Sequence, residues 1–310
     1  MPVNVPQLRA FVAVVDAGGF SAAADELGVS QSAVSHAVAS LERELAGPLL
    51  VRAGQVRTTV LGERVLPYAR GALSAVRGVE EVAADVAGTL TGTVRLAATP
   101  TVCQGLLPGL TAHWRESFPH VTVRVFEGDS AEIAGWLENG TADAAVLVDP
   151  PPGPGVRLAV DGYRALLPRD HPLAGEPVVD IRDLADDDFL ISPGGCEDRV
   201  RALHEPAGLR FAPAHRVRDL ATLISMVQAG IGVTVLSEVS RPLLPADLVL
   251  VRVSPRAARR LVLSGPRDRP WHPAVRALAE SAVTQLSRCP LSGERGTAWR
   301  HVRPQCAHEC

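Results

Sequence analysis

The chain has 310 residues and a formal net charge of −3, which is long for one compact core and favours two domains. All 31 basic residues are arginines, and with 46% hydrophobic and 21% charged residues the composition is ordinary for a soluble globular protein. No apolar run approaches the ~20 residues that span a bilayer, and the N-terminus lacks the basic start of a secretory signal. We therefore expect a cytoplasmic protein with no membrane partner, and reduced thiols rather than disulfides for its five cysteines.

Three short helices are predicted at the N-terminus. The first has one apolar face and ends at Gly18-Gly19, the second is capped by Ser21, and the third is capped by Ser30. On the third helix an apolar stripe faces one way, and the other face is small and uncharged: Gln31, Ser32, Ser35, His36 and Ala39. Two short extended runs around Ala53-Gly54 then predict a β-wing.

Charge in this segment is unusual for a protein that would bind nucleic acid. Residues 1–60 contain four basic residues, Arg9, Arg43, Arg52 and Arg57, against five acidic ones, Asp16, Asp25, Glu26, Glu42 and Glu44. A basic patch supplies mainly non-specific affinity for DNA, so its absence weakens that contribution without excluding sequence recognition.

Residues 61–90 form a long helix with a narrow apolar stripe. Its members alternate in steps of four and three: Val65, Ala69, Ala72, Val76, Val79, Ala83, Val86 and Leu90. A period of 3.5 residues is typical of a coiled-coil seam, and small residues allow close approach. The stripe favours a dimer over the alternative of an amphipathic helix packed on its own domain.

From Thr93 onward the pattern alternates between strands and helices. Strand-like runs are separated by helical stretches near 102–117, 130–139, 196–206, 219–229 and 271–287, and a proline-rich loop covers 149–155. Such alternation predicts mainly parallel sheets with helices on both faces. Residues 288–310 are polar and aperiodic, which predicts a disordered tail.

The chain resembles the LysR-type transcriptional regulators up to about residue 287. The resemblance is most specific in three motifs: Gln7-Leu8-x-x-Phe11, Gly19-Phe20-Ser21-x-Ala23-Ala24-x-x-Leu27, and Val29-Ser30-Gln31-Ser32-Ala33-Val34-Ser35. The match continues through Leu41-Glu42, Leu45, Pro48-Leu49 and Arg52. Departures cluster in the wing, where Leu50 replaces the usual Phe and TTVLG (58–62) stands for LTEAG.

The resemblance implies an α/β chain of four parts. These are a winged helix-turn-helix (1–60), a linker and dimerisation helix (61–92), an effector domain similar to periplasmic binding proteins (93–287) and the tail (288–310). The effector domain would divide into subdomain I (93–160 with 266–287) and subdomain II (161–265).

The resemblance also implies the partners. The head would bind an interrupted palindrome in promoter DNA as a dimer, within a homodimer or homotetramer that also meets RNA polymerase. Gln31 can pair with adenine, and hydroxyl groups adapt to either base type. The residues expected to contact DNA are Gln31, Ser32, Ser35, His36, Arg52 and Arg57.

A small-molecule effector of unknown identity would bind between the two subdomains. In such folds ligands meet strand ends and helix N-termini, whose free N–H groups favour anions. The expected effector-binding residues are Thr99, Thr101, Val102, Cys103, Ser130, Val148, Ser192, Cys196 and Thr234. Ser130 or its neighbour Asp129, taken alone, is better explained as a helix cap.

Two other interpretations remain open. Peroxide-sensing members of the family carry a reactive cysteine at a place matching Cys196, but here no second cysteine follows it before Cys289. A solute-binding or enzymatic α/β domain with a helical head is the alternative from another class. The chain contains none of the common catalytic or phosphate-binding motifs, and the Cys and His residues of the tail lack zinc-site spacing, so we expect no enzyme, cofactor or metal.

Overall fold

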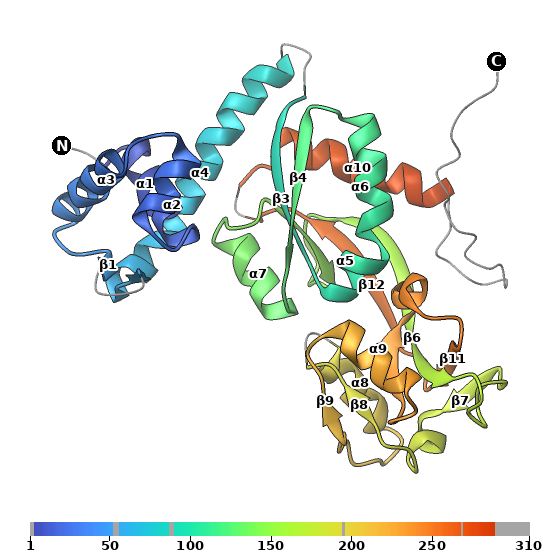
Figure 1. Cartoon of the computed structure of the whole chain (residues 1–310). Helices are drawn as coiled ribbons and strands as arrows, with labels where there is room; N and C mark the ends of the chain where they lie inside the picture. Colours follow the sequence, from blue (N-terminus) through green and yellow to red (C-terminus); the bar gives the residue numbers. More distant parts are fainter. Residues whose placement is uncertain (1–2, 52–55, 87–89, 194–195, 268, 289–310) are drawn as a thin grey trace, which may run out of the picture.

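Figure 1 shows a computed structural model of the chain, in which a helical head is joined by one long helix to a larger α/β domain. The structure describes residues 3–51, 56–86, 90–193, 196–267 and 269–288. Within these ranges no helix is both long enough and apolar enough to cross a membrane.

The head comprises three helices and a wing. The helices are α1 (Val5–Asp16), α2 (Phe20–Leu27) and α3 (Gln31–Glu44), and the wing is an antiparallel pair, β1 (Leu50–Val51) and β2 (Arg57–Thr58). Ser30 Oγ accepts the Ala33 N–H, which confirms the predicted cap of α3. The predicted cap at Ser21 is wrong, because Phe20 packs against the head core and already belongs to α2.

The apolar faces of the three head helices meet in one core. Phe11, Val14, Val38 and Leu41 are fully buried there. Each such side chain stabilises the fold by roughly 1.5–3 kcal/mol. Gln7 is also buried, and its amide group donates to Ser40 and Glu44, so it fixes α1 against α3.

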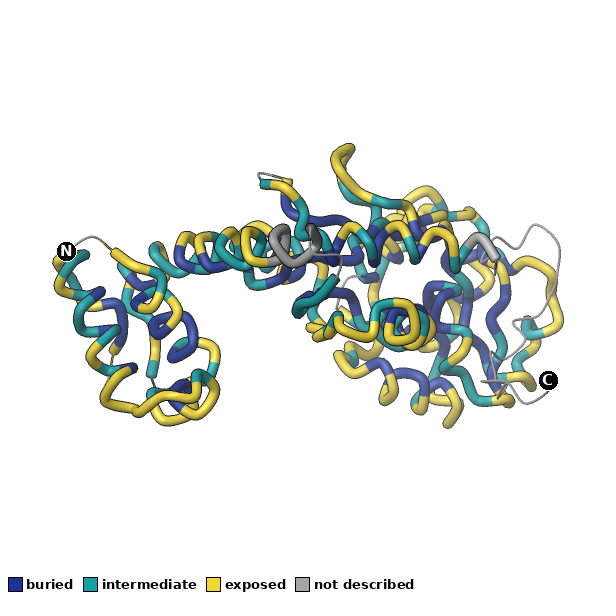
Figure 2. Tube along the Cα trace, turned by 90° about the horizontal axis from the view of Figure 1, so that it is seen from above, coloured by how far each residue is buried: buried dark blue, intermediate teal, exposed yellow. Residues whose placement is uncertain are grey.

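The long helix α4 (Val60–Val86) leads from the head to the α/β domain, as Figure 2 shows. The predicted apolar stripe is buried in the first part of this helix and exposed in the next. Ala69 is buried in the head core, as the alternative of packing on its own domain requires. Further along, Ala72 and Val79 are exposed and Val76 is half-buried, so this part of the stripe is uncovered in a single chain.

The α/β domain contains one eight-stranded sheet that runs through both subdomains. The first subdomain contributes β3 (Gly92–Ala98), β4 (Val121–Glu127), β5 (Ala144–Val148) and β12 (Ala258–Ser264). Its helices are α5 (Pro100–Gly105), α6 (Leu107–Ser117), α7 (Ser130–Glu138) and α10 (Pro273–Arg288).

The second subdomain lies below the first in Figure 1. It contains β7 (Val178–Asp180), β10 (Thr234–Ser237), β11 (Leu248–Ser254), and the short pair β8 (Leu190–Ile191) and β9 (His215–Arg216). Its helices are α8 (Glu197–His204), α9 (Leu220–Gln228) and two 3₁₀ turns, η1 (Ile181–Leu184) and η2 (Glu238–Leu243).

Strand β6 (Val156–Pro168) is shared by the two subdomains. It pairs with β12 up to Gly162, and with β10 from Tyr163 onward. All of its pairings, with β10, β11 and β12, are antiparallel. The prediction of mainly parallel sheets is therefore wrong: β3 is parallel to β4 and β5, and β11 to β7, but every pairing of β6 and of β12 is antiparallel.

The division of the domain also differs from the one expected. The sequence assigns 161–265 to the second subdomain, but β12 pairs with β5 and its residues lie in the first hydrophobic core. The chain therefore returns to the first subdomain where β11 leads into β12, before residue 266. The two crossings lie side by side in the sheet, because β11 and β12 both pair antiparallel with β6, one after the other along its length.

Candidate functional site

The outer face of α3 presents an exposed, uncharged surface. Gln31, Ser32 and His36 are exposed and Ser35 is half-buried, while Val34 and Val38 on the opposite face are buried in the head core. The Ser32 hydroxyl shares a hydrogen bond of 2.9 Å with the Ser30 hydroxyl at the start of the helix. Such side chains can donate to and accept from base edges in a major groove.

The acidic side chains of the head are largely committed to internal contacts. Glu42 Oε1 accepts the N–H groups of Leu49 and Leu50 at the start of the wing, at 2.9 and 3.2 Å. Glu44 accepts from Gln7, and Asp16 pairs with Arg70 of α4. These three carboxylates hold helix, wing and linker together, and the other two acidic residues, Asp25 and Glu26, are exposed on α2 rather than on α3.

The wing provides one of the two arginines expected to reach DNA. Arg57 is exposed on β2. Arg52 falls outside the described residues, so its predicted contact remains a prediction.

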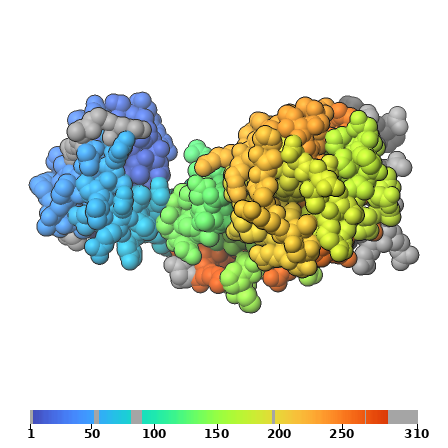
Figure 3. Space-filling model, turned by 90° about the horizontal axis from the view of Figure 1, so that it is seen from below, coloured from blue at the N-terminus to red at the C-terminus, as the bar shows by residue number. Residues whose placement is uncertain are grey.

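A single arginine of the linker helix contacts both large parts of the chain. Arg70 Nη2 pairs with Asp16 at the end of α1, and its Nη1 donates to Thr141 Oγ1 of the α/β domain at 2.6 Å. Arg77, further along α4, contacts Asp143. In Figure 3 the head and the α/β domain form two lobes that meet over a narrow neck. Arg70 and Arg77 of α4 thus connect the linker helix with the α/β domain.

The effector residues predicted around α5 are mostly buried. Thr101 and Val102 are buried, and Val102 belongs to the first hydrophobic core. The N–H groups of Val102 and Cys103 already bond the Thr99 carbonyl, and Pro100 has none, so the first turn has few donors left for an anion. The Thr99 hydroxyl is buried and has no hydrogen-bond partner among the described residues.

At the ends of β4 and β5 the predicted residues differ in their surroundings. Ser130 is exposed, and Asp129 caps α7 by accepting the N–H groups of Ala131 and Glu132. That carboxylate occupies the helix N-terminus, in agreement with the cap interpretation. Val148 is half-buried and lies directly before Asp149.

In the second subdomain three predicted residues lie at different depths. Ser192 is half-buried and donates to the Arg218 carbonyl at 3.3 Å. Thr234 is fully buried, and its hydroxyl donates to the Leu190 carbonyl at 2.7 Å. Cys196 is buried at the start of α8.

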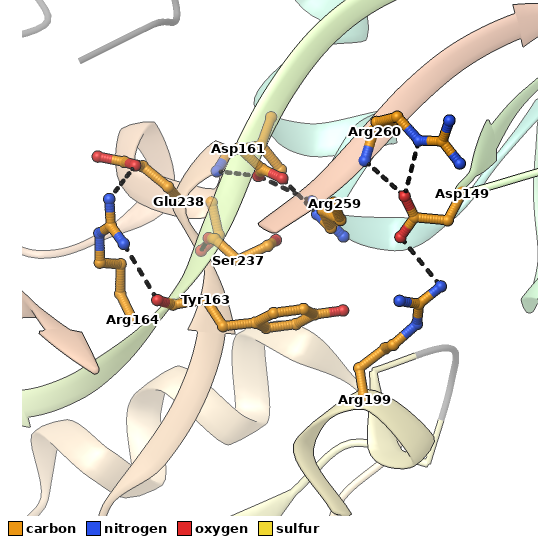
Figure 4. Close-up of polar contacts among 11 residues, drawn as sticks. Asp149, Asp161, Tyr163, Arg164, Arg199, Ser237, Glu238, Arg259 and Arg260 are labelled. Atoms are coloured by element: carbon orange, nitrogen blue, oxygen red, sulfur yellow. Dashed lines mark hydrogen bonds and ion pairs between the residues drawn. The ribbon is translucent and has the colours of Figure 1, made fainter. Parts of the chain in front are cut away.

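Cys196 belongs to a polar group that we call the hinge cluster: Asp149, Asp161, Tyr163, Cys196, Arg199 and Arg259. Figure 4 shows this group, apart from Cys196, around β6 and β12 where the subdomains join. Asp161 and Arg259 are partners in the β6–β12 register and form a buried ion pair at 2.6 and 3.1 Å. Burial lowers the pKa of Arg259, but pairing with Asp161 outweighs it and leaves the pKa above its ordinary value.

Asp161 also ties the second subdomain to the crossing strands. Its carboxylate accepts the Val239 N–H at 3.0 Å, at the start of η2. Gly105 of α5 faces the same turn so closely that a Cβ would meet the Val239 carbonyl oxygen at 1.9 Å. The two subdomains therefore touch through backbone at this point, and only glycine fits there.

The two described cysteines are poorly suited to form thiolates. Burial raises the pKa of Cys196, and Arg259 and the Tyr163 hydroxyl offset this rise only in part. Burial, together with Glu127, raises the pKa of Cys103 to about 12. Both are free thiols. No group of three or more His, Cys, Asp or Glu residues in the described part of the chain could hold a metal ion.

Most of the hinge cluster could not be predicted from the sequence. Asp161 shares its strand with Arg157 and Arg164, and Arg259 lies next to Arg260, so nothing local shows that Asp161 and Arg259 are partners. The available signal is a charge at a position where the strand is buried, because a buried charge is usually paired.

Comparison with known proteins identifies the chain. Residues 5–63 match the family described as bacterial regulatory helix-turn-helix protein, lysR family, and residues 87–287 match the LysR substrate binding domain. The chain belongs to the LysR family. It is therefore a LysR-type transcriptional regulator with an effector-binding domain, and the winged head and two-subdomain α/β domain expected from the sequence are confirmed.

Several relatives resemble this LysR-type regulator over most of its length. A probable hydrogen peroxide-inducible genes activator of Mycobacterium leprae (strain TN) is 35% identical over 246 residues, which cover 77% of this chain and 79% of the relative. A full-length OxyR variant from Pseudomonas aeruginosa has a TM-score of 0.73 at 24% identity, covering 91% of this chain and 98% of that one. Full-length CbnR, solved with its target DNA, has a TM-score of 0.64 at 23% identity, covering 91% and 99%. These two structures share the fold.

Proposed function

We propose that this LysR-type regulator binds promoter DNA through α3 and the wing, and that a small molecule bound between its two subdomains changes that binding. The observation that carries the DNA assignment is the α3 face, exposed and uncharged, with Gln31, Ser32 and His36 on the side away from the core. The two acidic side chains of α3, Glu42 and Glu44, are held in internal contacts. The protein would act in the cytoplasm, where it would also meet RNA polymerase.

The proposed regulator works as a dimer or as a tetramer built from dimers. The support is the uncovered half of the α4 stripe, where Val79 is 72% exposed and Ala72 and Val76 lie on the same side. A second copy of α4 would cover this stripe with knobs-into-holes packing. Two-fold symmetry then places two α3 helices on two half-sites.

A gel-shift experiment with the DNA upstream of the regulator's own reading frame tests the proposal. We expect a specific complex that unlabelled specific DNA displaces and that scrambled DNA does not. A Gln31→Ala variant should weaken the complex, and the exposed control Glu26→Gln, on α2, should not. A solute-binding protein or an enzyme with a helical head would form no specific complex.

A second candidate is redox regulation through Cys196. It is favoured by the position of Cys196 at the start of α8 and by the relatives named as peroxide-inducible genes activators. The raised pKa opposes it, because the thiolate is the reactive form. Mild peroxide should alter the DNA footprint of the wild type and not that of Cys196→Ser if this candidate holds. An unchanged footprint in both proteins would remove it.

A further inference from the structure

One carboxylate of the hinge cluster joins the two subdomains. Asp149 follows β5 in the first subdomain, and its Oδ2 pairs with Arg199 Nη2 of α8, in the second, at 3.0 Å. Its Oδ1 accepts the backbone N–H of Arg260 at 2.9 Å. Asp149 adopts a left-handed backbone conformation, with φ of 47°, which is uncommon for a residue other than glycine. The carboxylate is thus held in place by contacts from two directions.

The arginine that meets this carboxylate is partly open to solvent. The side chain of Arg199 is 46% exposed, and that of Asp149 only 13%. An arginine guanidinium offers parallel N–H donors that match a carboxylate. Asp149 therefore occupies a position that a carboxylate from outside the chain could also reach from the side of Arg199.

A second group in the same place has an unused hydrogen bond. The Tyr163 side chain is buried, with 1% of the residue exposed, and Figure 4 shows its ring extending toward Arg199 and Arg259. Its hydroxyl lies near the Cys196 thiol and has no hydrogen-bond partner among the described residues. A buried hydroxyl without a partner is unfavourable, and an incoming acceptor would satisfy it.

The charges of the cluster favour one kind of ligand. Asp161 pairs with Arg259, and Asp149 pairs with both Arg199 and Arg260, so three arginines meet two carboxylates here. A carboxylate that replaced Asp149 would keep this charge balance, and a neutral ligand would leave the arginines without a counter-charge.

We propose that Asp149 is a built-in substitute for the effector: a small monocarboxylate binds Arg199 and the Tyr163 hydroxyl, displaces Asp149, and releases the ion pair that joins the two subdomains. This inference rests on the proposed function, because it identifies the chemical class of the effector and the contact that the effector breaks. Because Asp149 and the ligand compete for Arg199, the ligand binds more tightly to the state in which the Asp149–Arg199 pair is broken. Such a difference in affinity is what allows a ligand to shift a conformational equilibrium.

Acetate tests the site without knowledge of the natural effector. In the full-length Asp149→Gly protein, glycine suits the left-handed backbone and leaves Arg199 and Arg260 without the carboxylate that they share. We expect acetate to raise the midpoint of thermal unfolding by about 2 °C at concentrations several times its dissociation constant. Acetamide and sodium chloride of equal ionic strength should not. Acetate should bind the wild type at least about ten-fold more weakly, because Asp149 competes there.

Two further variants decide the outcome. Adding Arg199→Gln to Asp149→Gly should abolish the effect of acetate, and adding Arg182→Gln, a surface arginine paired with Asp180, should not. If the glycine variant fails to accumulate, Asp149→Asn keeps the shape, loses the charge, and should bind acetate more tightly than the wild type. An equal response to acetate and acetamide, or one that survives loss of Arg199, would overturn the inference.

The proposed function is tested separately. If the wild type forms a specific complex with its upstream DNA but acetate never distinguishes the variants, the inference fails and the regulator remains. If no DNA complex forms but the stabilisation by acetate still depends on Arg199, the anion site stands and the proposed function fails.

Discussion

The head and the hinge cluster use polar side chains in opposite ways. In the head the polar residues proposed for function are exposed, as Gln31 and His36 are, and the buried polar residue Gln7 only fixes the fold. At the hinge the polar residues are buried, with Asp161 and Arg259 below 10% exposed, and the same contacts hold the fold and join the subdomains. A change on the head surface should alter recognition alone, whereas a change at the hinge should alter stability as well.

The largest effect should come from breaking the buried ion pair. Arg259→Met leaves Asp161 charged and unpaired, so the free energy of unfolding should fall by about 3–5 kcal/mol in urea titrations. The double variant Asp161→Asn, Arg259→Met should recover most of this loss, because asparagine still accepts the Val239 N–H. A matched change at the surface, Arg182→Met, should leave the unfolding curve unchanged. If Arg259→Met alone were as stable as the double variant, the unpaired Asp161 charge would not be the cause of the loss.

The next effect concerns the uncovered stripe of α4. Val79→Asp should leave the single chain folded, because Val79 is 72% exposed, yet separate the dimer by placing a charge in its interface. Loss of two-site binding should weaken operator affinity by about 100-fold or more. Sedimentation and gel shift measure the two effects, with Val79→Thr as the uncharged control. If Val79→Asp stays oligomeric, the stripe is not the interface.

A smaller effect is expected on the DNA-binding face. A bidentate contact from Gln31 to adenine is worth about 1–3 kcal/mol of discrimination, so Gln31→Ala should lose about ten-fold in specific affinity and relax preference at one base pair. Gel shifts with single-base operator variants measure both changes. Stability should not change, because Gln31 is exposed.

Arg57→Gln should affect DNA binding in a different way from Gln31→Ala. It should weaken binding to all sequences alike and lower the salt-dependence slope by about 1. With only Arg9, Arg43, Arg52 and Arg57 basic in residues 1–60, a slope near −10 for one dimer would contradict our account of the charges.

The smallest effect should come from the neck. Arg70→Gln removes the side chain that contacts both Asp16 and Thr141, and we expect the distance between head and effector domain to become more variable. Small-angle scattering of the full chain should show a broader distance distribution, with little change in thermal stability. Arg64→Gln, an exposed position on the same helix, is the control. Equal scattering from both variants would mean that Arg70 does not restrain the head.

The sequence was sufficient for the head and for the order of elements, but not for the hinge. An exposed helix face is encoded in residues three and four apart, so the α3 surface could be predicted from 14 consecutive residues. Asp161 and Arg259 are 98 residues apart and meet only because β6 and β12 adopt one particular register. The same reason explains the wrong expectation of parallel sheets, since strand order is not a local property. The hydrogen bond from Thr234 to Leu190 could not be predicted either, because the two residues are 44 positions apart in the sequence.

Strand β6 limits what kind of movement the effector domain can make. On one side of Gly162 it is bonded to β12 and on the other to β10, so neither subdomain can slide along it without losing a row of hydrogen bonds. A slip of one residue would also turn every buried side chain to the opposite face. A change in twist breaks no such row, and neighbouring strands of a sheet are rotated relative to one another by about 20–25° in any case. We therefore expect any rearrangement of the effector domain to change the angle between the subdomains rather than their position along β6.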